Sequence, residues 1–154
     1  MITNYYGKDQ YNKKKRRGLD TVNRFDFNCG GYALETYNWY LPVEGLRQAS
    51  RYFDSWYDED REEVLEGTVK HMLKEFKGKL RIIQNVEELK DNEYAIAYRI
   101  GDGDFHFAKR NKKGVWFHKR GKTPYIERMT KEEVFSSSWG HRYDSPIVLF
   151  AKIR

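Results

Sequence analysis

The pattern of apolar and polar positions is helical in the first half of the chain. Between residues 28 and 40, a mostly apolar and aromatic stripe recurs at spacings of three and four, at Cys29, Tyr32, Ala33, Thr36, Tyr37 and Tyr40. This spacing predicts a helix that Asn28 caps and that Pro42 ends. A second helix is predicted over residues 58–77, because acidic residues crowd its first turns, lysines its last turns, and Gly78 follows it.

Short apolar runs separated by turn residues replace the helical pattern after residue 80. The runs LRII, EYAIAYRI, DFHFAKR, GVWFHK and PIVLFAKI predict strands, and VEELK predicts a short helical piece. Helices followed by strands are typical of an α+β domain. We therefore expect N-terminal helices, the first of them carrying Cys29, packed on a C-terminal antiparallel β-sheet.

Length and composition favour one domain that follows a basic arm. The chain has 154 residues, which suits a single core. Residues 1–20 are polar and basic, so we expect an arm with little regular structure there, followed by one domain over residues 21–154. The sequence has neither an apolar stretch of membrane-spanning length nor the apolar centre of a signal peptide. The product is therefore expected in the cytoplasm, unless another system exports or releases it.

The net charge of +6 is concentrated in short clusters. Candidate contacts for a polyanion are Lys13, Lys14, Lys15, Arg16 and Arg17 in the arm and Lys109, Arg110, Lys112 and Lys113 in a predicted hairpin. A basic patch attracts nucleic acid, other acidic polymers and acidic proteins alike. The same residues also fit an ordinary basic surface, so charge alone identifies no partner.

The only cysteine lies in the run NCGGYAL, at the predicted start of the first helix. The positive end of a helix and its free backbone N–H groups favour thiolate over thiol at Cys29, and the same N–H groups suit an oxyanion. Gly30 and Gly31 would leave room for a substrate beside the sulfur. Asn28 and Asn23 are candidate side-chain donors to the oxyanion, with capping alone as the other role of Asn28. The simpler alternative for Cys29 is buried packing.

Two of the four histidines lie on a predicted hairpin and could supply the base that a cysteine nucleophile needs. A three-residue loop over residues 111–113 would place His106 directly opposite His118, close enough for one imidazole to orient the other. A four-residue loop would instead set His106 against Lys119. The sequence does not choose between these two registers.

Other chemistries lack the residues that they require. One cysteine excludes an internal disulfide and a cysteine-built zinc site. The two hairpin histidines bring only Asp104 as a nearby carboxylate, so we expect neither a metal nor a cofactor. The chain has no GxSxG motif for serine catalysis, and GDGDF lacks the lysine of a phosphate-binding loop.

The run NCGGYA, followed by a strand histidine and by a second polar residue a dozen positions later, resembles the papain-like cysteine peptidase superfamily, closest to its NlpC-type branch. The resemblance implies a papain-like fold in which Cys29 is the nucleophile, His106 the general base and His118 the group that orients the base. It implies cleavage of an amide bond in a peptide, protein or peptidoglycan-type substrate through a thioacyl-enzyme. NCGG stands where the family commonly has DCSG, and residues 43–80 insert an acidic helix.

Two functions are compatible with the sequence. The first is a cysteine peptidase or amidase, with acyl transfer to an amine as a variant of the same chemistry. The second is a non-enzymatic protein that binds nucleic acid or another polyanion through the basic clusters and neighbouring aromatic residues. A binding affinity that falls steeply with salt would favour the second function.

Overall fold

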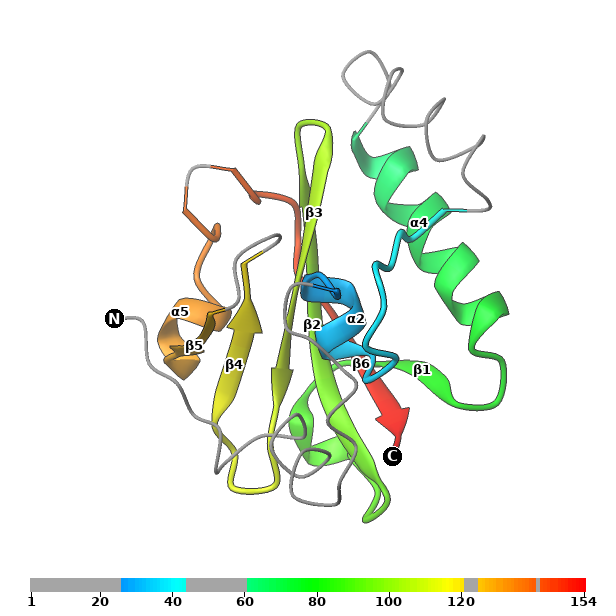
Figure 1. Cartoon of the computed structure of the whole chain (residues 1–154), viewed down its shortest axis with the longest axis vertical. Coiled ribbons are helices and arrows are strands. Elements are labelled where there is room, and N and C mark those ends of the chain that lie inside the picture. The colour runs from blue at the N-terminus through cyan, green and yellow to red at the C-terminus, as the bar shows by residue number, and fades with distance from the viewer. Residues whose placement is uncertain (1–25, 44–60, 121–124, 141) are drawn as a thin grey trace.

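Six antiparallel strands form one sheet with the spatial order β1-β6-β2-β3-β4-β5 (Figure 1). The computed structural model describes residues 26–43, 61–120, 125–140 and 142–154. The strands are β1 (Leu80–Ile83), β2 (Glu93–Gly101), β3 (Asp104–Arg110), β4 (Trp116–Lys119), β5 (Ile126–Met129) and β6 (Val148–Ile153). The helices are α2 (Cys29–Ala33), α4 (Arg61–Glu75), α5 (Lys131–Val134) and the 3-10 helix η1 (Val86–Glu88). The predicted α+β class with an antiparallel sheet is confirmed, whereas the predicted arm over residues 1–20 lies outside the described residues.

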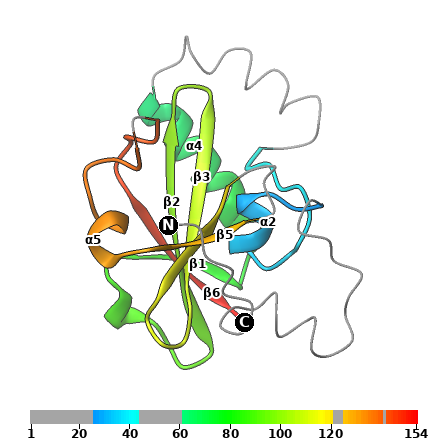
Figure 2. The same ribbon diagram turned by 60° about the vertical axis from the view of Figure 1, so that its left-hand side comes forward.

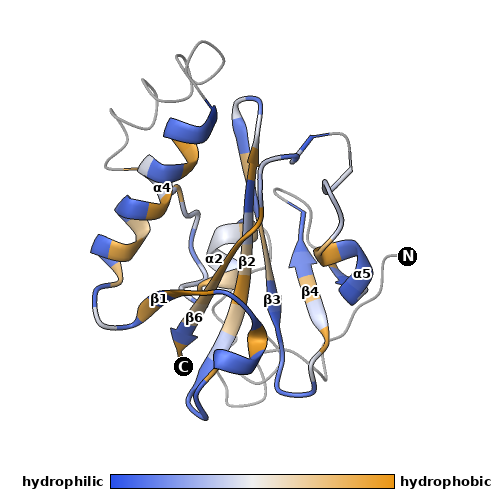
Figure 3. Cartoon of the chain, turned by 180° about the vertical axis from the view of Figure 1, so that it is seen from behind, coloured by the Kyte–Doolittle hydropathy of each residue, from blue (hydrophilic) through white to orange (hydrophobic). Residues whose placement is uncertain are grey.

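Strand β2 lies in the middle of the sheet and is buried along almost its whole length. Alternation along the strand turns large side chains to one face and alanines to the other. The large residues are Tyr94, Ile96, Tyr98 and Ile100, and the small ones are Ala95 and Ala97. Figure 3 shows β2 and β6 in the middle of the molecule, with orange and pale segments along both strands. Because both faces of β2 are covered, its sequence is a nearly continuous apolar run rather than an alternating one.

Two helices cover the face that carries the large side chains. Helix α4 packs against β1 and β2 through buried Val64, Val69 and Met72, and α2 packs against β3 and β4. The helix predicted over 58–77 is confirmed over its described part, and Gly78 follows it with a φ of 81°. Within residues 26–43, 61–120, 125–140 and 142–154, no helix has the length and apolar character needed to cross a membrane.

Shorter elements cover the opposite face of the sheet. Figure 2 shows α5 on the other side of the sheet from α2. Val86 of η1, Val134 of α5 and Trp139 pack there in one apolar cluster with the alanines of β2. Neither α5 nor β5 is among the elements predicted above. Thr130 and Glu133 form a capping box at the start of α5, and their Thr-x-x-Glu spacing is the sequence signal that could have predicted this helix.

Helix α2 is shorter than expected, and the prediction that it extends to residue 40 is wrong. The chain leaves the helix after Ala33 and takes positive φ angles of 57° at Glu35 and 53° at Tyr37. These left-handed residues turn the backbone around, and the N–H groups of Thr36 and Tyr37 bind back to the carbonyl oxygen of Gly31. The aromatic stripe that predicted a longer helix instead packs on both sides of this turn.

The two glycines of NCGG make room for the returning chain. A Cβ on Gly31 would lie 1.9 Å from the carbonyl oxygen of Asn38, and a Cβ on Gly30 would lie 2.9 Å from a ring carbon of Tyr40. The space beside the glycines is therefore filled by the protein itself. The expectation that they leave room for a substrate is wrong.

Replacing Gly31 with alanine should lower the free energy of unfolding by about 1–3 kcal/mol, because the added Cβ overpacks against backbone. Gly30→Ala is a matched control with a smaller expected loss, since its nearest neighbour is a side chain and both variants gain the same helix propensity. Urea denaturation measures both losses. Equal losses in the two variants would contradict a backbone that returns over Gly31.

Candidate active site

The loop between β3 and β4 sets the positions of the two hairpin histidines. Arg110 pairs with Trp116 at the end of the ladder, which leaves residues 111–115 in the loop. Asn111 closes this loop, because its Oδ1 accepts the N–H of Val115 at 2.9 Å and its own N–H donates to the Val115 oxygen at 2.8 Å. The predicted three-residue loop is wrong, and the four-residue alternative does not form either.

His106 and His118 meet despite the longer loop. A change of two residues in loop length keeps each side chain on its predicted face, so His118 lies one diagonal step from His106 rather than directly opposite it. The Nε2 atom of His106 lies 2.8 Å from Nδ1 of His118, and the two rings are nearly perpendicular. The predicted contact between the imidazoles is confirmed, and the predicted direct opposition is not.

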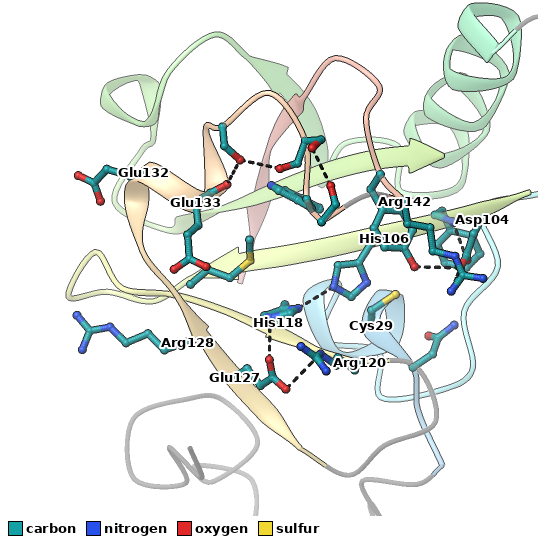
Figure 4. Close-up of a pocket in the computed structure, with 18 of the residues that line it drawn as sticks. Cys29, Asp104, His106, His118, Arg120, Glu127, Arg128, Glu132, Glu133 and Arg142 are labelled. Carbon is teal, nitrogen blue, oxygen red and sulfur yellow. Dashed lines mark hydrogen bonds and ion pairs between the residues drawn. The ribbon is translucent and has the colours of Figure 1, made fainter. Parts of the chain in front are cut away.

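Cys29 shares a pocket with the two histidines, beside the point where β3 and β4 separate. Among the described residues, pairing between these two strands is limited to Lys109–Phe117 and Arg110–Trp116, so no described residue of β4 pairs with the first part of β3. Strand alternation points the N–H of Phe107 to the β4 side, and this N–H reaches the thiol of Cys29. Figure 4 shows the sulfur in the same pocket as the two imidazoles.

The pocket that holds these three side chains has a volume of about 1170 Å³. Side chains of both charges line it, namely Asp104, Arg120, Glu127, Arg128, Glu132, Glu133 and Arg142. Trp39, which is 45% exposed, adds an apolar surface. The volume is slightly larger than is usual for small-molecule pockets, and the mixed lining is able to contact a polar, extended ligand.

Burial controls the protonation of Cys29. The residue is only 4% exposed, and this burial raises the pKa of its thiol to about 12, although the N–H groups of Phe107 and Gly30 act in the opposite direction. The negative charge of Asp104 raises the pKa further. The direction is opposite to the one expected for a helix-initial cysteine, because α2 has a single turn and the sulfur is desolvated.

The histidine at the centre of the pocket is also neutral. Burial lowers the pKa of His106 well below 6.5, and the neighbouring His118 and Arg120 lower it further. At neutral pH the pocket therefore contains a thiol and an uncharged imidazole. The thiol of Cys29 is then a proton donor and the imidazole of His106 a proton acceptor, and no preformed thiolate is present.

Glu127 on β5 is the residue of the pocket that sequence reasoning missed. It pairs with His118 in the β4–β5 ladder, and its Oε2 lies 3.5 Å from Nε2 of His118. Its other oxygen lies 3.2 Å from Nε of Arg120. Burial is the largest influence that lowers the pKa of His118, and the charge of Glu127 opposes it. Only the pairing of β5 with β4 identifies this carboxylate as a partner of the histidine.

Aromatic and acidic side chains hold the His106 ring in place. Tyr143 stacks on the imidazole with ring centres 5.2 Å apart, and Trp139 meets it edge-on at 5.9 Å. The hydroxyl of Tyr143 donates to Asp104 at 2.9 Å. His106 is therefore fixed by contacts to its faces and edge as well as by His118.

Asn28 caps α2 and clamps the returning chain. Its Oδ1 accepts the N–H groups of Gly31 and Tyr40, both at 3.0 Å, and its Nδ2 donates to the Tyr40 oxygen at 2.7 Å. Asn28 also lines the pocket beside Cys29. The capping role is confirmed, while a role as oxyanion donor stays a prediction. Asn23 lies outside the described residues.

The predicted polyanion contacts are only partly at the surface. Lys109 is 3% exposed, lies 3.4 Å from the carboxylate of Glu35 and sits over the ring of Tyr32. Its side chain therefore does not contribute to an exposed basic patch. Arg110 is partly buried, whereas Lys112 and Lys113 are exposed on the hydrophilic loop between β3 and β4 (Figure 3). Residues 13–17 lie outside the described residues, so binding of a polyanion stays a prediction.

Comparisons of the chain with protein-family models, with curated proteins and with solved structures return no match. In the described part of the chain, no group of three or more His, Cys, Asp or Glu side chains is placed to hold a metal ion. The chemistry of the pocket is therefore argued from the thiol of Cys29, the contacting imidazoles of His106 and His118 and the buried carboxylate of Glu127.

Proposed function

We propose that the protein is a cysteine hydrolase, a peptidase or amidase of papain-like, NlpC-type fold, that cleaves an amide bond through a thioacyl-enzyme. One observation carries the proposal: Cys29, His106 and His118 come from three separate elements into one pocket, where the two imidazoles are 2.8 Å apart. The chain order of a helix-borne cysteine, a strand histidine and a second histidine on the next strand also supports it.

In the first step, the sulfur of Cys29 attacks the carbonyl carbon of the substrate while its proton moves to His106. The accepting atom is Nδ1, because His118 already engages Nε2. A carbon–sulfur bond forms, and the electron pair of the carbonyl π bond moves to oxygen. When the C=O bond reforms, the carbon–nitrogen bond breaks and the proton on His106 passes to the leaving amine.

In the second step, water attacks the thioester and gives a proton to the same nitrogen of His106. The carbon–sulfur bond then breaks, and the proton returns to the sulfur of Cys29. An amine in place of water would take the acyl group instead, and the same residues would then catalyse acyl transfer. The backbone N–H of Cys29 and the second amide hydrogen of Asn28 are the proposed donors to the oxyanion.

The pocket supports a peptide, protein or peptidoglycan-type substrate. Its volume of about 1170 Å³ suits an extended ligand. Asp104 and Arg142 lie on one side of the histidines and Arg128, Glu132 and Glu133 on the other (Figure 4). A substrate with charged groups of both signs on either side of the scissile amide would find a counter-charge for each.

Acetylation by p-nitrophenyl acetate tests the proposal without knowledge of the natural substrate. The protein should release a burst of one equivalent of p-nitrophenolate and carry one acetyl group on Cys29 by mass spectrometry, because attack on this ester follows the first step above. Cys29→Ala should abolish both signals. Acetylation that persists in Cys29→Ala, or a parent protein that is never acetylated, would reject the proposal. Faster loss of the acetyl group with added glycinamide than with water alone would favour transferase over hydrolase.

A further inference from the structure

We infer that Glu127 fixes the ring tautomers of both histidines and thereby makes Nδ1 of His106 the basic atom of the pocket. The inference deepens the proposed function and rests on it. Glu127 is a positioning residue in this scheme, since it acts on His106 only through His118. Figure 4 shows the resulting line of side chains from Glu127 through His118 to His106.

The buried carboxylate of Glu127 fixes the position of the proton on His118. Glu127 is 5% exposed, and its Oε2 lies 3.5 Å from Nε2 of His118. An ionised carboxylate only accepts hydrogen bonds, and a ring lone pair facing it would be repelled. The neutral imidazole of His118 therefore carries its single proton on Nε2, toward Glu127.

The position of the proton on His118 determines where His106 carries its own proton. With its proton on Nε2, His118 has a lone pair on Nδ1, and this atom lies 2.8 Å from Nε2 of His106. A contact at this distance needs one hydrogen between the two nitrogens, and it must come from His106. The proton of His106 is thus on Nε2, and Nδ1 keeps the lone pair that accepts the thiol proton.

The opposite tautomers would leave the pocket without a base. If His118 carried its proton on Nδ1, Nε2 of His106 would have to accept it, and Nδ1 of His106 would carry the hydrogen. The atom free to face Cys29 would then be a donor. A neutral imidazole in that state cannot take the proton of a thiol, so the carboxylate decides whether the pair is active.

Arg120 holds the carboxylate in this position. Its Nε lies 3.2 Å from Oε1 of Glu127, which leaves Oε2 for His118. The charged or titratable groups that face His118 are Glu127 on β5, Arg120 directly after β4, Glu133 on α5 and His106 on β3. The two acidic groups raise the pKa of His118, whereas burial and Arg120 lower it.

The ¹⁵N resonances of the imidazoles test the inference directly, because protonated and unprotonated ring nitrogens differ widely in shift. In ¹⁵N-histidine-labelled protein at pH 7.5, both His106 and His118 should be protonated on Nε2 and unprotonated on Nδ1. A proton on Nδ1 of either histidine, together with normal acetylation of Cys29, would overturn the inference and leave the proposed function intact. The expected tautomers in a protein whose Cys29 is never acetylated would overturn the proposed function and this role with it.

Two charge variants separate a positioning role from a structural one. Glu127→Gln keeps the shape but offers both a donor and an acceptor, so the tautomers should become mixed and acetylation of Cys29 should slow by about 10–100-fold. Arg120→Gln keeps the carboxyl group of Glu127 beside Nε2 of His118, so the tautomers should be retained. The pKa of His118 should fall in Glu127→Gln and rise in Arg120→Gln.

Unchanged tautomers in Glu127→Gln, or pKa shifts of His118 in the same direction in both variants, would overturn the inference. If Glu127→Gln does not fold, the exposed Arg120→Gln variant and the parent spectrum still decide the matter.

Discussion

Replacing His106 with alanine should slow the acetylation of Cys29 by p-nitrophenyl acetate by about 10²–10⁴-fold at pH 7. The thiol is buried and its pKa is raised to about 12, so almost none of it is ionised at neutral pH. Attack therefore needs a base that removes the proton as the carbon–sulfur bond forms. His106 lines the same pocket as Cys29 and is uncharged at neutral pH, and it is the base that we propose.

The pH dependence of the acetylation rate should distinguish the parent protein from His106→Ala more clearly than the rate at one pH. The pKa of His106 is well below 6.5, so the parent protein has its neutral base throughout the neutral and mildly alkaline range. Its acetylation rate should change little between about pH 7 and pH 9. In His106→Ala only preformed thiolate reacts, so the rate should rise about tenfold per pH unit over that range.

His71 offers a matched control for this experiment. It lies in helix α4 and does not line the pocket, so His71→Gln should leave rate and pH profile unchanged. A parent rate that rises tenfold per pH unit, as in His106→Ala, would show that His106 does not act as base. Cys29 would then be a packing residue with the ordinary reactivity of a buried thiol.

Replacing Glu35 with alanine should lower the free energy of unfolding by about 3–5 kcal/mol, because it leaves the buried ammonium group of Lys109 without its counter-charge. Glu35 lies 3.4 Å from Lys109 and 3.1 Å from Arg154, and the lysine is 3% exposed. The double variant Glu35→Ala, Lys109→Met should recover much of the loss, since it removes the uncompensated charge as well. Urea denaturation measures each step. A single variant as stable as the parent would contradict a buried ion pair at this position.

The loss in Glu35→Ala should also depend on pH. Burial raises the pKa of Glu35, but the charges of Lys109 and Arg154 together hold it below 4.5 in the folded protein. Its folded pKa is thus lower than its unfolded pKa, so its stabilising effect is complete above pH 4.5 and disappears as pH falls through the folded pKa. The difference in stability between the parent and Glu35→Ala should therefore be largest near pH 7 and shrink in acid. Arg154→Ala, which removes the more exposed partner, should cost less than Glu35→Ala.

Local signals predicted most of the elements that surround the site. The strands LRII, EYAIAYRI, DFHFAKR and PIVLFAKI and the helix up to Glu75 follow the periodicities that predicted them. Helix α2 is the main exception. Its stripe of aromatic residues has helical spacing, but Glu35 and Tyr37 take left-handed conformations that let the chain return over Gly31. Tertiary packing of the aromatic rings overrides the local preference there.

The candidate site was predictable only where the alternation of side chains along a strand was enough to place a residue. Alternation along two strands places His106 and His118 on one face if the loop has three or five residues, but a four-residue loop would place them on opposite faces, so their contact was predicted only for one of the two registers considered. Glu127 follows its partner by nine residues, and residues 121–124 of the connection lie outside the described structure. No local pattern connects YIERM with a particular histidine.

The sequence by itself determined the α+β class, the strands and helix that form its core and the cap of Asn28, because these depend on neighbours close in the chain. Only the tertiary structure decided that the first helix stops after Ala33, that the hairpin register brings His106 to His118, that Glu127 stands beside His118 and that Cys29 is a buried, neutral thiol. Each of these depends on contacts between distant segments, through chain return, strand pairing or desolvation. Such contacts have no periodicity that a single sequence displays.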